Sequence, residues 1–207
     1  MSPANVSFAD IPVFRAANLA PAGGGGSWRL DNLVGILAEI SQETPSGALS
    51  FVTEIIAEAQ AKNEPVAWVG GTDSIFFPPD LLARGIDLSA LAVVRVGGEA
   101  DSMTAAEWLL RSGAIGLLVI DCEGKWNASD GSLGRIQKLA ERSSCAVVFL
   151  TRARRDAPSL GSRISLRGYV ARSPEGPFRI EIRTVKDKRS NSLCRQSRHY
   201  HGPPGMH

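Results

Sequence analysis

The sequence predicts an α/β fold in which a mostly parallel central sheet is flanked by helices and carries an antiparallel hairpin at its C-terminal end. Between residues 33 and 150, continuous apolar runs of strand length alternate with segments whose apolar residues recur at helical spacing. This alternation is typical of a parallel sheet covered on both faces. After Leu150, apolar and polar residues alternate one by one over two short runs, which indicates an antiparallel hairpin with one face in water. The apolar fraction of 43% and the charged fraction of 21% are ordinary for a globular domain and exclude a fibrous or fully disordered chain.

The expected elements follow one another along the chain. Buried strands are predicted where short apolar runs occur, at residues 34–40, 66–69, 91–94, 115–120 and 145–150. Helices are predicted at residues 49–59, where the apolar spacing ends before Pro65, and at residues 103–111 and 133–142. Pro78 and Pro79 open a further short helix, because proline is tolerated in the first turn. The hairpin strands are expected at residues 164–170 and 178–182, with Pro174-Glu175-Gly176 between them.

The chain is expected to have three parts. Residues 1–27 form a flexible N-terminal arm and glycine hinge, because the four glycines at 23–26 lose much backbone entropy when they become ordered. Residues 28–185 form the core domain. Residues 186–207 form a basic, partly disordered C-terminal tail, because they are polar and contain Gly202-Pro203-Pro204-Gly205 near their end.

Charge is distributed unevenly along the chain. The formal net charge is only +2, but residues 1–151 carry 10 basic and 17 acidic side chains, whereas residues 152–207 carry 13 basic and 4 acidic ones. A basic end of this kind is expected to meet a polyanion or to dock on an acidic surface. An arginine-rich sheet face that meets only water is equally compatible with this pattern.

The cysteines and the hydropathy indicate a cytoplasmic protein. Three widely separated cysteines without a CxxC pair favour neither a disulfide framework nor a cysteine zinc site, so a reducing compartment is expected. The chain has no apolar run of 18 residues that would cross a membrane. Its first residues lack the basic and apolar regions of a secretory signal, so no membrane contact is expected.

The segment after the first expected strand lies where many α/β proteins bind phosphate. A phosphate loop needs glycines, a lysine for the β- and γ-phosphates, and a hydroxyl group that holds magnesium. Here Gln42 replaces the first glycine and Gly47 is retained, while Ala48 replaces the lysine and Leu49 the hydroxyl residue. Because the loop lacks this preorganised charge, we expect no nucleotide hydrolysis, no bound cofactor and no enzymatic activity.

The apolar run at residues 115–120 ends in Asp121, at the carboxyl end of an expected strand. Such a run resembles a Walker B strand, whose aspartate orients magnesium. Where the lysine loop is absent, the alternative that Asp121 caps a loop or pairs with an arginine is favoured.

The order of these motifs from about Trp28 to Lys188 resembles the RecA recombinase core. Residues 76–91, with Gly85-Ile86-Asp87, resemble one passage of that core, and residues 108–114 resemble its helix end before the Walker B strand. Residues 183–188 resemble its late strand. Within the superfamily, the chain is similar to the ImuA family, RecA-like accessory proteins of a bacterial inducible mutagenesis cassette that lack a functional phosphate loop. The residues that carry this resemblance are Val13-Phe14-Arg15-Ala16-Ala17, the glycines at 23–26 followed by Trp28, and Phe76-Phe77-Pro78-Pro79.

The resemblance implies a RecA-like core at residues 28–185 that binds and assembles rather than catalyses. Such proteins act in translesion DNA synthesis after DNA damage, beside an error-prone polymerase and an inactive Y-family polymerase relative, ImuB. ImuB is therefore the expected partner, RecA and a second copy of the chain are further ones, and the location is the nucleoid-associated cytoplasm. RecA-fold subunits join head to tail through an apolar residue of an N-terminal arm, and Phe14 and Ala17 fit the F-x-x-A form of that motif. An arm that folds back on its own core is the alternative.

The resemblance also places DNA near the loops after the strands that follow Walker B. Sequence-independent, salt-sensitive contacts to DNA or to a partner are expected from eight basic residues: Arg152, Arg154, Arg155, Arg163, Arg167, Lys186, Lys188 and Arg189. The alternative is that these side chains pair with acidic groups of residues 1–151 or of a partner.

Two other functions stay open on the sequence alone. One is an ATP-dependent RecA-like recombinase or regulator that has relocated its phosphate contacts. The other follows from a second relative without the loop, the cell-division inhibitor SulA of the SOS response, although the basic C-terminal part of the chain argues against it.

Overall fold

The computed structural model describes residues 28–43, 47–174, 179–190 and 193–200. The predicted N-terminal arm, with Phe14 and Ala17, lies outside the described residues. In the described part of the chain, no helix has the length and hydropathy needed to cross a membrane.

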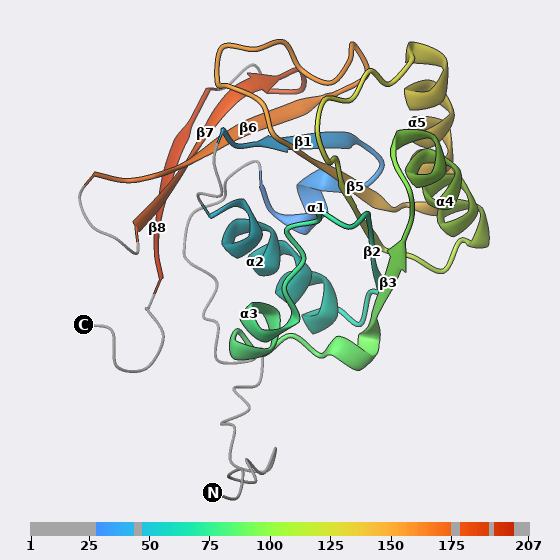
Figure 1. The fold of residues 1–207 in the computed structure, drawn as a ribbon, viewed down its shortest axis with the longest axis horizontal. Coiled ribbons are helices and arrows are strands. Elements are labelled where there is room, and N and C mark those ends of the chain that lie inside the picture. The colour runs from blue at the N-terminus through green and yellow to red at the C-terminus, as the bar shows by residue number, and fades with distance from the viewer. Residues whose placement is uncertain (1–27, 44–46, 175–178, 191–192, 201–207) are drawn as a thin grey trace, which may run out of the picture.

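The described strands form an eight-stranded sheet in the order β3-β2-β4-β5-β1-β6-β7-β8 (Figure 1). The first six positions, from β3 to β6, pair in parallel, and β6, β7 and β8 pair antiparallel. The predicted fold class, a mostly parallel sheet with a C-terminal antiparallel hairpin, is confirmed. The strands are β1 (Leu37–Ser41), β2 (Val66–Gly70), β3 (Leu91–Arg95), β4 (Leu117–Asp121), β5 (Ala146–Thr151), β6 (Leu166–Arg172), β7 (Arg179–Asp187) and β8 (Arg195–His199).

Helices cover both faces of the parallel part of the sheet. The described helices are α1 (Leu30–Leu33), α2 (Ala48–Ala61), α3 (Pro78–Ala83), α4 (Glu99–Ser112) and α5 (Asp130–Ser143), with a single 3-10 turn at Leu88–Ala90. The apolar side of α2 packs on one face together with residues of α1 and α3, whereas α4 and α5 lie together on the other (Figure 1). Strands β1, β2, β4 and β5 are buried at every position, which explains their continuous apolar sequences.

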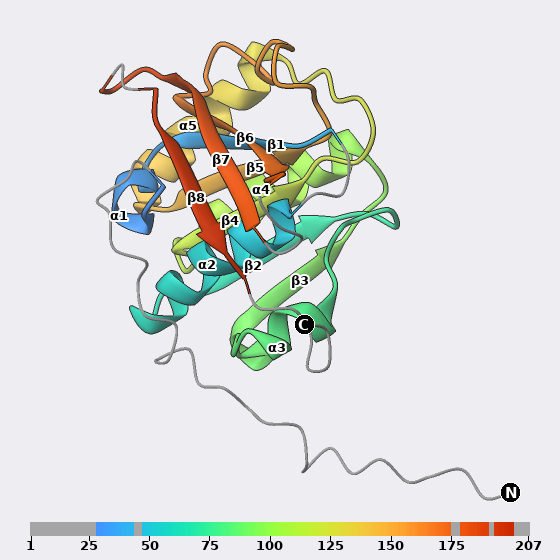
Figure 2. The ribbon, with the colours of Figure 1, turned by 90° about the vertical axis from the view of Figure 1, so that its left-hand side faces the viewer.

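We call β6, β7 and β8 the wing. These strands extend the sheet beyond β1, and Figure 2 shows β7 and β8 crossing in front of the rest of the molecule with α2 behind them. Ile180 and Ile182 of β7 belong to the cluster of buried side chains that also contains the apolar side of α2. The wing therefore has an inner face, which packs on α2, and an outer face.

The C-terminal segment differs from the prediction. Residues 186–207 were expected to be a partly disordered tail, but β7 runs to Asp187 and β8 pairs with β7 along its whole length. Tyr200 is buried, and the Arg84 guanidinium lies 4.5 Å from the centre of its ring. The core thus extends past residue 185. The sequence of β8 shows no alternation of apolar and polar residues. This strand is held by its backbone pairing with β7 and by the buried side chain of Tyr200, so it does not need an apolar face of its own.

Candidate functional site

The predicted nucleotide-related residues lie at one edge of the sheet. Strands β1, β4 and β5 are neighbours in parallel, so their carboxyl ends come together. Ser41 of β1 pairs with Thr151 of β5, and Asp121 of β4 pairs with Leu150. Gln42 follows β1 and Arg152 follows β5, so the phosphate-loop position, the Walker B-like aspartate and the first predicted DNA-binding arginine share this edge.

The protein's own side chains occupy the described part of the phosphate-loop position. Gln42 is buried, and its Oε1 accepts a hydrogen bond of 3.3 Å from the backbone N–H of Ala48, the first residue of α2. The N–H groups at a helix N-terminus are the groups that bind phosphate in a phosphate loop. Ala48, in place of the lysine, is buried, and Leu49, in place of the hydroxyl residue, packs against the cluster around α2. Both residues therefore contribute to the hydrophobic core.

Gly47 is in contact with the wing. Its φ of 114° lies in the left-handed region, which favours glycine. A Cβ at this position would lie 2.2 Å from Cδ1 of Ile180, a residue of β7. Ile180 therefore covers the backbone of Gly47, a contact between residues far apart in the sequence.

The carboxylate of Asp121 is hydrogen-bonded to a neighbouring loop and does not face solvent. Its Oδ2 accepts hydrogen bonds from Ser74 Oγ at 2.7 Å and from the Ile75 N–H at 2.6 Å, both in the loop between β2 and α3. The carboxylate is buried, and burial raises the pKa of Asp121, while these hydrogen bonds and the charge of Arg152 act in the opposite direction. This loop-capping arrangement is the alternative that the sequence favoured, although the loop follows β2 and not β4.

The described residues near Asp121 do not form a metal centre. Glu123 lies against Gly71, where a Cβ would be 2.7 Å from Glu123 Oε2, and Glu123 Oε1 is buried without a hydrogen-bond partner among the described residues. Within the described ranges, no group of three or more His, Cys, Asp or Glu side chains could hold a metal ion.

The variant Asp121→Asn is expected to change how stability depends on pH. Because the pKa of Asp121 is raised in the folded protein, the folded state binds a proton there more tightly than the unfolded state. Relative to the variant, the wild-type protein should gain stability as pH falls through the raised pKa, and the gain should level off below the ordinary value of 3.8. Urea unfolding of both proteins at pH 7 and pH 4 measures this difference. A wild-type protein that loses stability relative to Asp121→Asn on acidification would contradict the prediction.

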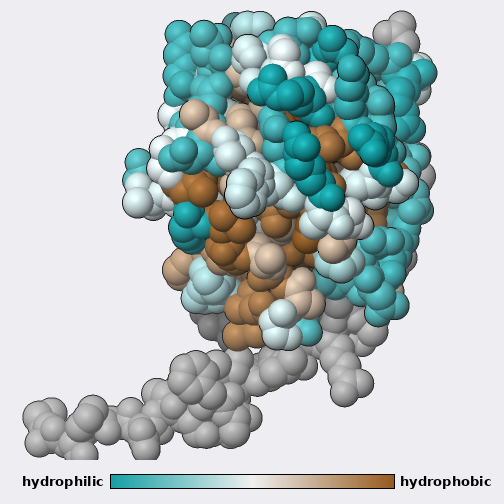
Figure 3. Space-filling model, turned by 90° about the vertical axis from the view of Figure 1, so that its right-hand side faces the viewer, coloured by the Kyte–Doolittle hydropathy of each residue, from teal (hydrophilic) through white to brown (hydrophobic). Residues whose placement is uncertain are grey.

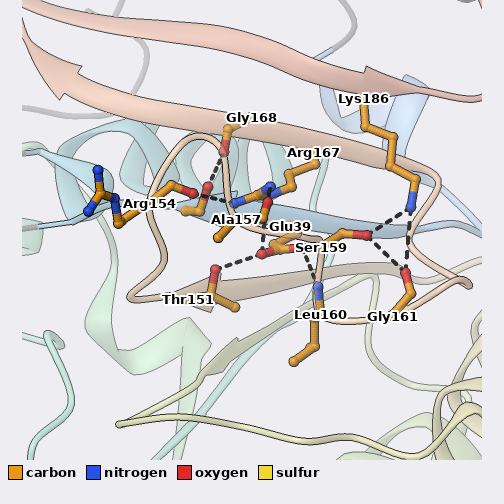
Figure 4. Close-up of polar contacts among 11 residues, drawn as sticks. Glu39, Thr151, Arg154, Ala157, Ser159, Leu160, Gly161, Arg167, Gly168 and Lys186 are labelled. Carbon is orange, nitrogen blue, oxygen red and sulfur yellow. Dashed lines mark hydrogen bonds and ion pairs between the residues drawn. The ribbon is translucent and has the colours of Figure 1, made fainter.

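Arg167 is not available to DNA, which corrects the sequence prediction. Its side chain is 4% exposed, and its Nε lies 3.3 Å from Oε1 of Glu39, whose side chain is 1% exposed (Figure 4). This contact is an ion pair without the alignment of a hydrogen bond. The other two guanidinium nitrogens donate to the carbonyl oxygens of Ala157 and Arg154, so Arg167 holds the loop after β5 on the sheet.

Glu39 is the centre of this network. Its Oε1 accepts a hydrogen bond of 2.8 Å from Thr151 Oγ1, and its Oε2 accepts one of 2.9 Å from the Leu160 N–H (Figure 4). The sequence reasoning missed Glu39. The available signal was a carboxylate in the middle of an otherwise apolar buried strand, since such a group needs a partner.

Most of the other predicted basic residues also have partners within the chain. Arg163 pairs with Asp130 at 3.2 Å, and Lys186 donates to Ser159 Oγ at 2.9 Å. Lys188 donates to the Ser162 carbonyl and Arg189 to the Asn32 carbonyl. Arg152 donates to the Asp73 carbonyl. Of these contacts, only that of Arg163 with Asp130 is a pair with an acidic group of residues 1–151, and the others go to a hydroxyl group or to backbone carbonyl oxygens.

Six of the eight predicted basic residues are exposed, and three of them, Arg152, Arg154 and Arg155, follow β5. The side chain of Arg154 is 71% exposed and lies 3.5 Å from Asp156, and Arg155 is exposed. The sequence could not separate these two arginines from Arg167, because the same residue type occurs at all three positions.

An apolar groove lies at the opposite edge of the sheet, between β3 and α4. It has a volume of about 450 Å³ and is lined mainly by Val94, Val96, Ala105, Trp108 and Leu109. Trp108, which lines the groove, is 74% exposed. Figure 3 shows apolar side chains gathered on this side of the molecule. Because β3 is the last strand of the described sheet, its outer backbone edge also lies beside the groove.

The mixed α/β sheet, mostly parallel with a C-terminal antiparallel hairpin, is consistent with a RecA-like fold, and comparison with known proteins finds distant similarity to RecA proteins. No family model matches the chain. The chain is 29% identical to Protein RecA of Allorhizobium ampelinum over 193 residues, which cover 79% of the chain and 53% of the relative. It is 26% identical to Protein RecA of Acinetobacter baumannii over 187 residues, 77% of the chain and 53% of the relative. It is 31% identical to Protein RecA of Chlorobium limicola over 103 residues, 46% of the chain and 29% of the relative.

These similarities support membership of the RecA-like superfamily and agree with the observed sheet. The chain spans about half or less of the length of these curated relatives.

Proposed function

We propose that this protein is a non-catalytic RecA-like accessory protein of damage-induced translesion DNA synthesis, of the ImuA type. In this role it binds an ImuB-type inactive Y-family polymerase in the nucleoid-associated cytoplasm and works without a nucleotide cofactor. The RecA-like fold and the similarity to RecA proteins support the superfamily on which this proposal builds.

The observation that carries the proposal is the occupied phosphate-loop position. A phosphate group bound at the start of α2 would compete with the Gln42 amide for the Ala48 N–H and with Ile180 for the space above Gly47. Ala48 and Leu49 have neither a cationic group nor a hydroxyl group with which to bind the phosphate or its magnesium ion. Phosphoryl transfer depends on such preorganised charge, so its absence favours a binding function over hydrolysis.

Titration calorimetry with magnesium ATP tests the loss of the nucleotide site. We expect no heat of binding for this protein under conditions in which a RecA protein gives a clear isotherm. ATP binding by the wild-type chain would overturn the proposal in favour of an ATP-dependent RecA-like regulator. The matched variant Ile180→Ala removes the side chain that covers Gly47 without adding a charge, and it should also give no heat of ATP binding.

In this proposal the groove between β3 and α4 receives Phe14 from the arm of a second copy of the chain. The 14 peptide steps from Phe14 to Trp28 can span at most about 50 Å, which is enough to reach a neighbouring molecule. Peptides are commonly recognised in this way: the peptide pairs as an extra strand along a free sheet edge, here that of β3, and places an apolar side chain in a neighbouring groove. In the arm motif, Phe14 supplies the apolar anchor.

A pull-down with ImuB, RecA and a differently tagged copy of this chain tests the partners. Phe14→Ala and Trp108→Ala should both weaken self-association in sedimentation velocity. Leu193→Ala is the matched control, because Leu193 is an exposed apolar residue that does not line the groove. Binding to none of the three proteins would remove the basis of the scaffold function, and equal self-association in all variants would overturn the role of the groove.

A further inference from the structure

A serine and a lysine from two different elements are hydrogen-bonded to each other beside the sheet. Ser159 belongs to the loop between β5 and β6, and Lys186 belongs to β7. Lys186 Nζ donates to Ser159 Oγ at 2.9 Å, and Ser159 Oγ donates to the carbonyl oxygen of Gly161 at 3.1 Å (Figure 4). Both side chains are half-buried. The pair therefore has the direct contact that a nucleophile and its base need, and it stays partly open to solvent.

The backbone on both sides of Ser159 is tied to the sheet. Two residues before it, the carbonyl oxygen of Ala157 accepts a hydrogen bond from the buried guanidinium of Arg167. One residue after it, the Leu160 N–H donates to Oε2 of the buried Glu39 at 2.9 Å. A group that the fold already holds in place has little freedom left to lose when it reacts. The loop thus positions the Ser159 hydroxyl in advance.

The surroundings of Lys186 favour the neutral form of its amine. Burial lowers the pKa of Lys186 below the ordinary value of 10.5, and the positive charges of Lys188 and Arg167 lower it further, while the carboxylate of Glu39 acts in the opposite direction. A neutral amine has a lone pair that can take a proton, whereas a protonated amine can only donate. Positive charge in this neighbourhood also favours the negative oxygen that develops when a hydroxyl group attacks a carbonyl.

We propose that Ser159 is a modification site, a nucleophile that accepts an acyl group from a small activated ester, with Lys186 as its base. Ser159 Oγ attacks the carbonyl carbon of the ester while its proton passes to Nζ of the neutral lysine. The bond from this carbon to the leaving oxygen then breaks, the leaving oxygen keeps the electron pair, and the proton on Nζ passes to it or to water. An acyl-serine and a free alcohol remain. Each chain reacts once in this step, so the site is compatible with the non-catalytic function proposed above and does not depend on it.

Incubation of the full chain with p-nitrophenyl acetate, followed by peptide mapping in a mass spectrometer, tests the site. In the wild-type protein the fastest acetylation should be located on Ser159 and should release an equal amount of p-nitrophenolate. This fast phase should be absent from Ser159→Ala. In Lys186→Arg it should be slower by about 100-fold, because a general base contributes at least roughly that factor. Arginine keeps the positive charge and can still donate to Ser159, but it does not give up its proton, so a purely structural lysine would be replaced without this loss.

The matched control is Lys138→Met, because Lys138 is an exposed lysine of α5 and its loss should leave the labelling of Ser159 unchanged. In the wild type, the rate should rise with pH around a midpoint below 10.5, as Lys186 loses its proton. Acetyl groups on Lys186 in place of Ser159, no fast labelling of the wild type, or a Lys186→Arg protein that reacts as fast as the wild type would overturn this inference. The mapping of the wild type requires no variant to fold. The pull-down with ImuB is independent of these outcomes, so an unreactive Ser159 leaves the proposed scaffold function standing.

Discussion

Replacing Arg167 with methionine is expected to lower the free energy of unfolding by about 3–5 kcal/mol, because removal of one partner leaves a buried charge without compensation. The charge left behind is Glu39, which is 1% exposed and keeps only the hydrogen bonds from Thr151 and Leu160. The loop after β5 would also lose the guanidinium that binds two of its carbonyl oxygens. Urea unfolding followed by tryptophan fluorescence and by far-UV circular dichroism measures the loss.

The double variant Glu39→Gln/Arg167→Met is the control for this prediction. Glutamine carries no charge; its carbonyl oxygen can accept from the Leu160 N–H, and its amide N–H can donate to Thr151 Oγ1. The double variant should therefore recover much of the lost stability. An Arg167→Met protein as stable as the wild type would contradict the buried ion pair. A double variant less stable than Arg167→Met would show that the hydrogen bonds, and not the charge, dominate.

The variant Gly47→Ala is expected to lose roughly 2–5 kcal/mol of stability, from a backbone cost of about 1–2 kcal/mol and an overpacking cost of about 1–3 kcal/mol. The backbone cost arises because the φ of 114° is unfavourable for alanine. The packing cost arises because the new methyl group would meet Cδ1 of Ile180 at 2.2 Å. Equilibrium urea unfolding at pH 7 measures the total.

Ile180→Val separates the two contributions. Valine lacks the Cδ1 atom that the new methyl group would meet, and on its own the substitution should cost about 0.5–1.5 kcal/mol. The double variant Gly47→Ala/Ile180→Val should therefore lose less stability than the sum of the two single variants. Additive losses would show that the wing does not press on the phosphate-loop position.

The parallel part of the fold was predictable because local sequence determines it. Strands buried on both faces must be apolar throughout, and the segments between them show helical spacing, so the runs around Ile40, Trp68 and Val148 indicate strands before any partner is known. The chain shows the limit of this reasoning at β8. Its residues are polar, and it is a strand because β7 offers a free edge and Tyr200 anchors its end.

The candidate site was predictable only in its residue types. The missing lysine at Ala48 is visible in the sequence, but Ile180, which covers Gly47, is not, because 133 positions separate the two residues. In the same way, Arg154 and Arg167 look alike in the sequence. The exposure of each depends on where a carboxylate from another strand lies.

The sequence by itself determined the alternation of strands and helices, the loss of charge at the phosphate-loop position and the concentration of arginine after residue 151. Only the tertiary structure decided which of those arginines face solvent. The physical reason is that a buried charge requires a partner, and Glu39 of β1 meets Arg167 of β6 because the two strands are neighbours in the sheet. The pairing of strands far apart in the sequence therefore buries Arg167 and leaves Arg154, Arg183 and Arg195 at the surface.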